Sequence, residues 1–278
     1  MANAEGISPK ISLLITAYNA EPFIRAAIAA ALSQRYGDYE VIVVDDGSDD
    51  KTEAICRDFT HDTRFRYLKR KRIGRSRALN EGITASTGSY IAINDADDLS
   101  MPYRLGYASR FLQAHPEAAL VATKYVTSNS FRESIHGNLL PHVSEDHERP
   151  VWLSAAKLYC SNPIVHSTVV FRRAMWEAVG GYDEQLSMCV DYDLFLRAMR
   201  VGKVALLPDS TVVYFKNPET FFKKKSHMEY LRTLFAIKRQ ARESLSLPFW
   251  IRACDVLPVY LVARSLLKSV FIINKSAN

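Results

Sequence analysis

The chain of 278 residues lacks several features that define whole classes of protein. Its 11 glycines and 11 prolines are too few for a collagen-like or low-complexity chain. It has no uncharged apolar run of about 18 residues, and no apolar signal-peptide core follows Met1. With 48% hydrophobic and 24% charged residues, it is expected to bury a sizeable core rather than stay disordered.

Cysteine is also scarce. Cys56, Cys160, Cys189 and Cys254 are scattered, and none forms a C-x-x-C pair. A structural zinc site or a thioredoxin-like site is therefore not expected. Scattered cysteines in a chain of this length suit a reducing compartment, so we expect a cytoplasmic protein.

The usual phosphate-binding and nucleophile motifs are missing. No G-x-G-x-x-G follows the first expected strand, and neither G-x-x-x-x-G-K-[ST] nor G-x-S-x-G occurs. These absences argue against dinucleotide dehydrogenases, P-loop enzymes and hydrolases with a nucleophile elbow.

The net charge of +6 is unevenly distributed. Residues 1–215 carry −2, residues 216–242 carry +6 and residues 243–278 carry +2. A basic tail of this kind favours an anionic partner such as a membrane surface. Aromatic residues are sparse in the basic cluster, which argues against a nucleic acid partner. A polar stripe over Val259–Ile273 resembles an interfacial amphipathic helix; packing on the protein's own domain or in a homo-oligomer is the alternative.

Expected strands and helices alternate over the first hundred residues. Strands are expected at Ile11–Ala17, Tyr39–Val44, Arg64–Leu68 and Tyr90–Asn94, and helices at Phe23–Leu32, Asp50–Phe59 and Arg75–Ala85. This alternation predicts an α/β fold with a mostly parallel sheet flanked by helices. Further helices are expected at Pro102–His115, Arg172–Val179 and Asp191–Val201, and strands at Val204–Leu207 and Thr211–Phe215.

Carboxylates stand at two strand ends, where open parallel sheets bind ligands. Asp95 and Asp97 are two residues apart after Tyr90–Asn94, so they share a face. Oxygen ligands of this kind suit Mg²⁺ or Mn²⁺ beside a phosphate; an acidic loop that caps the next helix is the alternative. After the second strand, Asp46 is expected to contact a ligand, whereas Ser48 and Asp50 are expected to cap a helix.

Basic and imidazole side chains add further candidates. Eight basic residues and no acid lie between Arg64 and Arg77, and Arg75 begins a helix beside the expected crevice, where it suits a diphosphate. His136, His142 and His147 share an acidic loop whose composition explains them without a metal. His166 either borders the acceptor cavity or is a hydrogen-bonded core histidine.

The order of these motifs resembles family 2 glycosyltransferases of the GT-A fold. The matching segments are Ile15–Asn19, Val43–Ser48, Gly74–Gly82, Ser86–Ile91, Asp95–Asp98, and Gly180–Glu184 followed by Asp191–Arg197. The resemblance spans roughly residues 11–216. It implies a GT-A domain at 1–218, with a donor half at about 1–100 and an acceptor half at about 101–218. A basic, amphipathic helical extension would follow at 219–278.

The resemblance also implies roles for individual residues. Thr16, Ala17, Tyr18, Asn19 and Glu21 would line the base and ribose pocket, and Asp46 would bind the base. Arg75 would approach the diphosphate, Asp95 with its neighbour Ala96 would face the ribose, and Asp97 would ligate the metal. Asp191 would be the general base, with a helix N-cap as its alternative role.

Two positions depart from the family pattern. Val190 stands before Asp191 where the family usually has Glu, and Tyr214–Asn217 replaces a stretch that often contains Arg and His. Lys216 is the available cation in that stretch.

The sequence therefore predicts a metal-assisted inverting glycosyltransferase on the inner face of the plasma membrane. It would move a sugar from a nucleotide-diphosphate sugar, with UDP preferred, to a glycan or lipid-linked hydroxyl. Two alternatives are a nucleotide-sugar-binding module without turnover and a nucleotidyltransferase. The second would need a glycine-rich and basic loop after the first strand, which Thr16–Asn19 is not.

Overall fold

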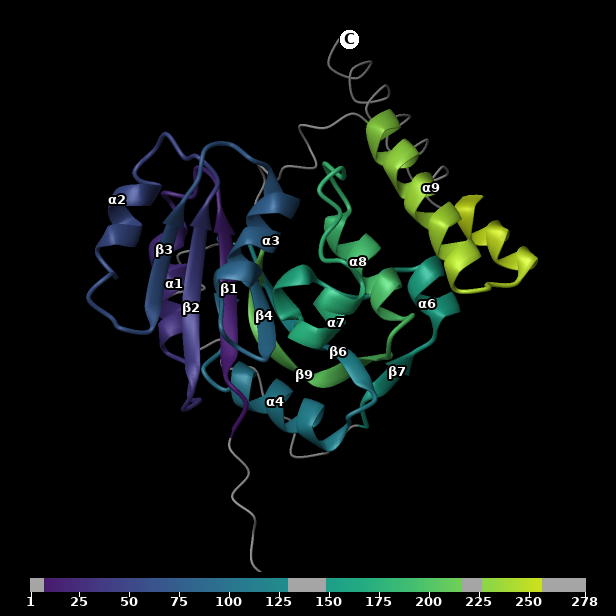
Figure 1. The fold of residues 1–278 in the computed structure, drawn as a ribbon, viewed down its shortest axis with the longest axis horizontal. Helices are drawn as coiled ribbons and strands as arrows, with labels where there is room; N and C mark the ends of the chain where they lie inside the picture. The colour runs from purple at the N-terminus through teal and green to yellow at the C-terminus, as the bar shows by residue number, and fades with distance from the viewer. Residues whose placement is uncertain (1–7, 130–148, 217–226, 257–278) are drawn as a thin grey trace, which may run out of the picture.

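The computed structural model describes residues 8–129, 149–216 and 227–256. One sheet runs through the molecule in the order β3-β2-β1-β4-β8-β6-β9-β5 (Figure 1). The first four strands are all parallel: β1 (Ile11–Ala17), β2 (Tyr39–Asp45), β3 (Phe65–Lys69) and β4 (Tyr90–Asp95). The predicted α/β fold with a mostly parallel, helix-flanked sheet is confirmed.

The other half of the sheet is mixed. β8 (Val170–Arg172) is antiparallel to β4 and to β6 (Ala118–Ser128), and β6 is parallel to β9 (Lys203–Phe215). The short strands β5 (Leu99–Ser100) and β7 (Val151–Leu153) are antiparallel to β9. The two strands expected within residues 204–215 are one strand, because β9 follows β6 through register shifts near Lys124.

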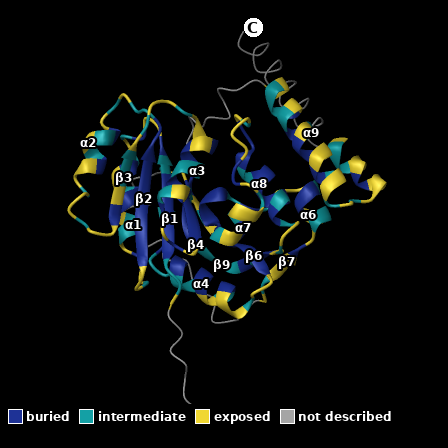
Figure 2. Cartoon of the chain, in the orientation of Figure 1, coloured by how far each residue is buried: buried dark blue, intermediate teal, exposed yellow. Residues whose placement is uncertain are grey.

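Helices cover both faces of the sheet. On one face lie α1 (Ile24–Leu32), α2 (Thr52–Arg57) and α4 (Arg104–Ala114), whose apolar residues pack with Leu13 and Ile15. On the other lie α3 (Arg75–Ala85), α6 (Ala155–Cys160), α7 (Arg173–Ala178) and α8 (Val190–Ala198), which share a core with Leu14. The central strands β1, β2 and β4 between these layers are almost wholly buried (Figure 2).

A glycine in α3 sets how close this helix comes to the sheet. A Cβ added at Gly82 would lie 2.4 Å from Leu14 Cδ1 and 2.9 Å from Val44 Cγ2. A side chain here would require Leu14 and Val44, or the helix itself, to shift. Because Arg75 is the first residue of α3, this close packing also holds Arg75 near the carboxyl ends of the strands.

The described part of the C-terminal extension packs on the domain itself. α9 (His227–Ser244) and η3 (Phe249–Asp255) place Leu234, Ile237 and Ile251 in the same core as α6 and α8. The boundary at residues 218 and 219, the Val259–Ile273 stripe and the loop with His136, His142 and His147 lie outside the described residues. In the described ranges, no helix is long and apolar enough to cross a membrane.

A disulfide joins Cys160 at the end of α6 to Cys254 in η3, with 5.2 Å between the Cα atoms. Cys56 and Cys189 are free and buried. Disulfides are rare in reducing compartments, so this bond disagrees with the compartment that we expected from the scattered cysteines. The pairing is non-local, since 94 positions separate the two residues and only the docking of η3 on α6 brings them together.

Candidate active site

The parallel register brings the predicted polar strand ends to one edge of the sheet. Thr16 in β1 is level with Val44 in β2 and with Asp95 in β4. The Asp46 amide donates to the Ala17 carbonyl at 2.8 Å, so the loops after β1 and β2 begin side by side. The structure therefore brings Thr16, Ala17, Asp46 and Asp95 together, as expected for a site at the carboxyl ends of the strands.

The loops after β1 and β2 are tied by side-chain bonds. The Asn19 Oδ1 accepts from the Asp49 amide at 3.0 Å, and the Glu21 side chain accepts from the Lys51 amide at 3.3 Å. In return, the Glu21 amide donates to Asp50 at 2.9 Å. In this structure Asn19 and Glu21 therefore brace the neighbouring loop. Ser48 does not cap α2: its hydroxyl donates to Asp45 at 2.6 Å.

Asp46 is buried and its carboxylate is engaged. Oδ1 accepts from the backbone amides of Ile73 at 2.6 Å and Gly74 at 3.1 Å, and Oδ2 forms an ion pair with Arg72. The same Arg72 guanidinium lies over the exposed ring of Tyr18, 3.4 Å from its centroid. A base could bind to Oδ2 of Asp46 only by displacing the Arg72 guanidinium from it.

The acidic turn after β4 contains three carboxyl groups with different surroundings. Asp95 and Asp97 are partly exposed, whereas Asp98 is buried and accepts bonds from the Ser167 hydroxyl and the Phe215 amide. Burial, together with the charges of Asp95 and Asp97, raises the pKa of Asp98 well above its usual range. Asp98 therefore holds the turn in place. The capping alternative is not observed, because the N-cap of α4 is Tyr103 and forms no side-chain bond.

Arg75 lies beside this turn. Its Nη2 donates to Asp95 Oδ1 and lies 3.0 Å from His166 Nδ1. The Arg75 side chain stays 45% exposed, so a ligand at this edge of the sheet can reach it. Although burial opposes the shift, the charges of Asp95 and Asp191 raise the pKa of Arg75. The site therefore holds a permanent, accessible cation of the type that binds diphosphate.

His166 is the hydrogen-bonded, buried histidine of one alternative, but it also contacts the site. It belongs to a short helix, η1 (His166–Thr168), and its Nε2 lies 2.8 Å from the Tyr182 hydroxyl. Burial and the charge of Arg75 lower its pKa to about 4. The imidazole is therefore neutral at physiological pH.

Asp191 is in the first turn of α8. The N-cap of α8 is Cys189, in the left-handed region with φ of 56°, so the N-cap alternative for Asp191 is not observed. Its charge acts on the pKa of Arg75, His166 and Tyr182. Asp191 therefore lies within electrostatic range of Arg75, His166 and Tyr182. The next acid, Asp193, instead pairs with Arg197, whose Nη1 donates to the Gly181 carbonyl at 2.7 Å.

Asp95 and Asp97 are the residues that could hold a divalent metal ion. They supply carboxylate oxygens, which fit Mg²⁺ or Mn²⁺. Over residues 8–129, 149–216 and 227–256, no three His, Cys, Asp or Glu side chains gather into a metal site. A metal ion here would need ligands from the donor phosphates, as is usual for Mg²⁺.

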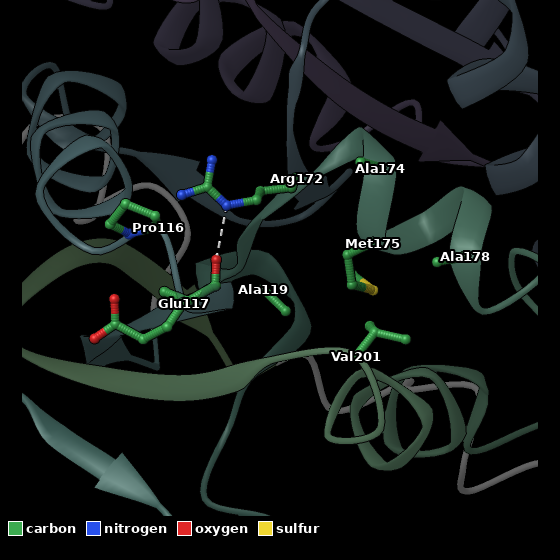
Figure 3. Close-up of a pocket in the computed structure, with 9 residues that line it drawn as sticks. Pro116, Glu117, Ala119, Arg172, Ala174, Met175, Ala178 and Val201 are labelled. Carbon is green, nitrogen blue, oxygen red and sulfur yellow. Dashed lines mark hydrogen bonds between the residues drawn. The ribbon is translucent and has the colours of Figure 1, made fainter.

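A separate hollow lies at the opposite edge of the sheet (Figure 3). Its lining includes Ala119, Met175, Ala178 and Val201, and Arg172 at its rim donates from Nε to the Ala118 carbonyl at 2.8 Å. Arg172 pairs with Tyr90, the first residue of β4, whereas Asp95 is the last. None of the predicted site residues lines this hollow.

Sequence reasoning missed the roles of Arg72, Ser167 and Tyr182. Tyr182 belongs to the Gly-Gly-Tyr motif, and that motif was the available signal. Gly181 has φ of 75°, and a Cβ there would lie 2.9 Å from Asn80 Oδ1. Asn80 in turn bonds both the amide and the carbonyl of Tyr182. The glycine thus lets Tyr182 dock on α3.

The chain is similar to known glycosyltransferases. The family model described as Glycosyl transferase family 2 matches residues 12–172. The putative glycosyltransferase EpsE of Bacillus subtilis is 31% identical over 200 residues, which cover 70% of this chain and 68% of EpsE. A chondroitin synthase of Escherichia coli is 31% identical over 195 residues, which cover 70% of this chain and only 27% of the synthase.

Solved structures show the same fold at low identity. TarS of S. aureus, residues 1–349, has a TM-score of 0.69 at 16% identity and covers 92% of this chain and 73% of that one. The mannosyltransferase PcManGT of Pyrobaculum calidifontis, in complex with GDP-Man and Mn²⁺, has a TM-score of 0.63 at 20% identity, covering 98% of this chain and 81% of that one. This chain therefore belongs to glycosyl transferase family 2 and is a glycosyltransferase of the GT-A fold.

Proposed function

We propose that the protein transfers a sugar, with inversion, from a nucleotide-diphosphate sugar to a hydroxyl of a glycan or lipid-linked acceptor. Two observations carry this proposal: the ion pair of Arg75 with Asp95 at the end of β4, and the effect of the Asp191 charge on the pKa of Arg75. A candidate base thus acts electrostatically on a candidate diphosphate cation. Residues 1–100 would form the donor half and residues 101–218 the acceptor half.

The chain's own residues supply the chemistry as follows. The oxygen of the acceptor hydroxyl bonds to the anomeric carbon of the donor sugar, and the bond from that carbon to the diphosphate breaks. Asp191 accepts the proton that the hydroxyl loses. Arg75 balances the charge on the departing diphosphate. A Mn²⁺ or Mg²⁺ ion held by Asp97 would add a Lewis acid at the same phosphates.

The nucleoside would lie over the loops after β1 and β2. Thr16, Ala17, Tyr18, Asn19 and Glu21 would line its pocket, Asp95 and Ala96 would face the ribose, and Asp46 would bind the base after Arg72 leaves it. UDP is the nucleotide that we propose first, and a solved TarS complex with UDP-GlcNAc supports that choice. The PcManGT complex makes GDP the second.

Calorimetric titration of UDP and GDP with Mn²⁺ tests the donor site. We expect metal-dependent binding that Asp97→Asn weakens and that the exposed control Asp183→Asn leaves unchanged. Equal binding by wild type and Asp97→Asn would remove Asp97 as the metal ligand. A nucleotide that binds without any turnover of its sugar conjugates would favour the silent binding module. Release of pyrophosphate from a nucleoside triphosphate would favour the nucleotidyltransferase.

We also propose that the C-terminal extension docks on an anionic membrane surface. Phe249, Trp250 and Val256 are 84%, 60% and 66% exposed, and Arg252 is exposed between them. The sequence from 256 to 278 holds three basic residues and no acid. Exposed aromatic side chains beside cations are typical of interfacial anchors.

Vesicle pelleting tests the membrane surface. The wild-type protein should sediment with phosphatidylglycerol vesicles and not with phosphatidylcholine vesicles. A double variant, Phe249→Ser with Trp250→Ser, should lose most of this binding, whereas Val201→Ser, which is exposed on another part of the surface, should keep it. Unchanged sedimentation of the double variant would contradict the proposal.

A further inference from the structure

His166 uses both ring nitrogens within the site. Nδ1 lies 3.0 Å from Arg75 Nη2, and Nε2 lies 2.8 Å from the Tyr182 hydroxyl. Arginine only donates hydrogen bonds, so Nδ1 has to be the acceptor. A neutral imidazole with an unprotonated Nδ1 carries its proton on Nε2, which then donates to the Tyr182 oxygen. With both nitrogens occupied, His166 is not available to move a proton on a substrate.

The two acceptors of Arg75 Nη2 affect its charge differently. The Asp95 carboxylate is negative and offsets the positive charge of the guanidinium. The His166 imidazole is neutral, so it fixes the orientation of the guanidinium without offsetting its charge. A neutral acceptor can fix the orientation of a cation and still leave its charge for an anionic ligand. His166 and Tyr182 are 5% and 2% exposed, beneath an Arg75 side chain that is 45% exposed.

The residues around His166 fix it from two sides. The next residue, Ser167, accepts from the Asp95 amide at 3.0 Å and donates to Asp98, so η1 is attached to the acidic turn. On the other side, Asn80 bonds both backbone groups of Tyr182 and so attaches it to α3, the helix that Arg75 begins. Both partners of His166, Arg75 and Tyr182, are therefore attached to α3, and His166 itself is attached to the acidic turn after β4.

We propose that His166 is a positioning residue that orients the Arg75 guanidinium toward the diphosphate of the donor. This inference rests on the proposed function, because it takes a nucleoside diphosphate as the ligand of Arg75. It assigns His166 to binding of the phosphates and not of the base, since its contacts are with Arg75 and Tyr182. It also explains the Gly-Gly-Tyr motif, because Tyr182 of that motif supplies the hydroxyl that bonds His166 Nε2.

The test compares UDP with uridine, which lacks the phosphates, by calorimetric titration. His166→Ala should weaken UDP binding roughly tenfold, as expected for loss of a bond to a charged group, and leave uridine binding within about twofold. His166→Asn places an amide oxygen near the position of Nδ1 and should recover most of the loss. Tyr182→Phe should weaken UDP binding in the same direction, and His115→Ala, a histidine beyond the crevice, should change neither ligand.

A merely structural role for His166 predicts a different result. His166→Ala would then lower the melting temperature while the ratio of UDP to uridine affinity stayed at the wild-type value, and this outcome would overturn the inference. Failure of His166→Asn to restore UDP binding, with near-ultraviolet circular dichroism intact, would overturn it as well.

A second measurement separates the inference from the proposed function. If wild type binds neither UDP nor GDP, the proposed donor class is wrong, and the contact is tested by a double-mutant cycle of His166→Ala and Arg75→Met on the unfolding equilibrium. For a direct bond, the effect of the double variant on the unfolding equilibrium constant should differ roughly fivefold or more from the product of the two single effects. A double effect equal to that product would overturn the orienting role.

Discussion

Arg72 lies over the ring of Tyr18, with its guanidinium carbon 3.4 Å from the ring centroid, while its Nη1 is paired with Asp46. These are the two contacts that the proposed base pocket offers to a nucleotide, one face to stack on and one carboxylate to bind. Arg72 occupies both in this structure.

The first prediction concerns this competition. Arg72→Ala should strengthen UDP binding roughly fivefold, because the ligand no longer displaces a cation–π contact and a half-exposed ion pair worth about 1 kcal/mol together. Lys71→Ala is the matched control, since it removes the same charge from the neighbouring exposed position. Titration calorimetry on both variants gives the comparison. Weaker binding by Arg72→Ala than by Lys71→Ala would show that Arg72 holds the base instead.

The second prediction concerns Asp191. Asp191→Asn should lower kcat by about 10²–10⁴, which corresponds to about 3–5 kcal/mol at the barrier, because the acceptor hydroxyl loses its base. The KM for the donor should stay close to that of wild type. Release of nucleoside diphosphate under single-turnover conditions measures the effect. Asp183→Asn, an exposed carboxylate in the preceding loop, is the control and should retain full activity; equal activity of the two variants would remove Asp191 from the chemistry.

The third prediction concerns pH. His166 has a folded pKa of about 4 against an ordinary value of 6.5, so the unfolded chain binds its proton first as pH falls. The stabilisation by neutral His166 is complete above pH 6.5 and is lost between pH 6.5 and 4, by about 3 kcal/mol in total. Burial and Arg75 cause the shift, Arg104 adds to it, and Asp95 and Asp191 oppose it.

Denaturant unfolding of wild type and His166→Asn between pH 4 and 7 checks this expectation. The wild-type free energy of unfolding should fall more steeply with acid than that of His166→Asn, because only the wild type has this histidine to protonate. Parallel curves for the two proteins would mean that His166 titrates normally in the folded state.

The fourth prediction concerns the Cys160–Cys254 bond. It closes a loop across 94 positions, so reduction should lower the free energy of unfolding by up to about 4–5 kcal/mol in the chain-entropy picture. Lys238 also ties η3 to α9: Nζ donates to the Cys254 carbonyl at 3.3 Å and lies 3.4 Å from Asp255. The reduced extension should therefore stay docked. Unfolding with and without reductant measures the effect, and Cys254→Ala should be insensitive to reductant. Equal stability of oxidised and reduced wild type would contradict the expectation.

Local patterns in the sequence determined the first four strands of the sheet and the helices between them. β1 (Ile11–Ala17) and α3 (Arg75–Ala85) have the expected bounds, because short apolar runs between turn residues and helical spacing are local signals. Parallel strands present their carboxyl ends at one edge, so the polar residues after β1, β2 and β4 had to meet there. The family motifs added the glycosyltransferase class, which the comparisons confirmed.

Only the tertiary structure decided the contacts that complete the site. His166 is 91 positions from Arg75, and Asn80 is 102 from Tyr182, so no local pattern specifies either bond. The antiparallel β8 and the long pairing of β6 with β9 were missed because a strand's direction and partner depend on distant segments. The sequence alone therefore determined which residues carry chemistry, whereas packing of the two halves decided which of them touch, because side-chain contacts form only when distant elements share a core.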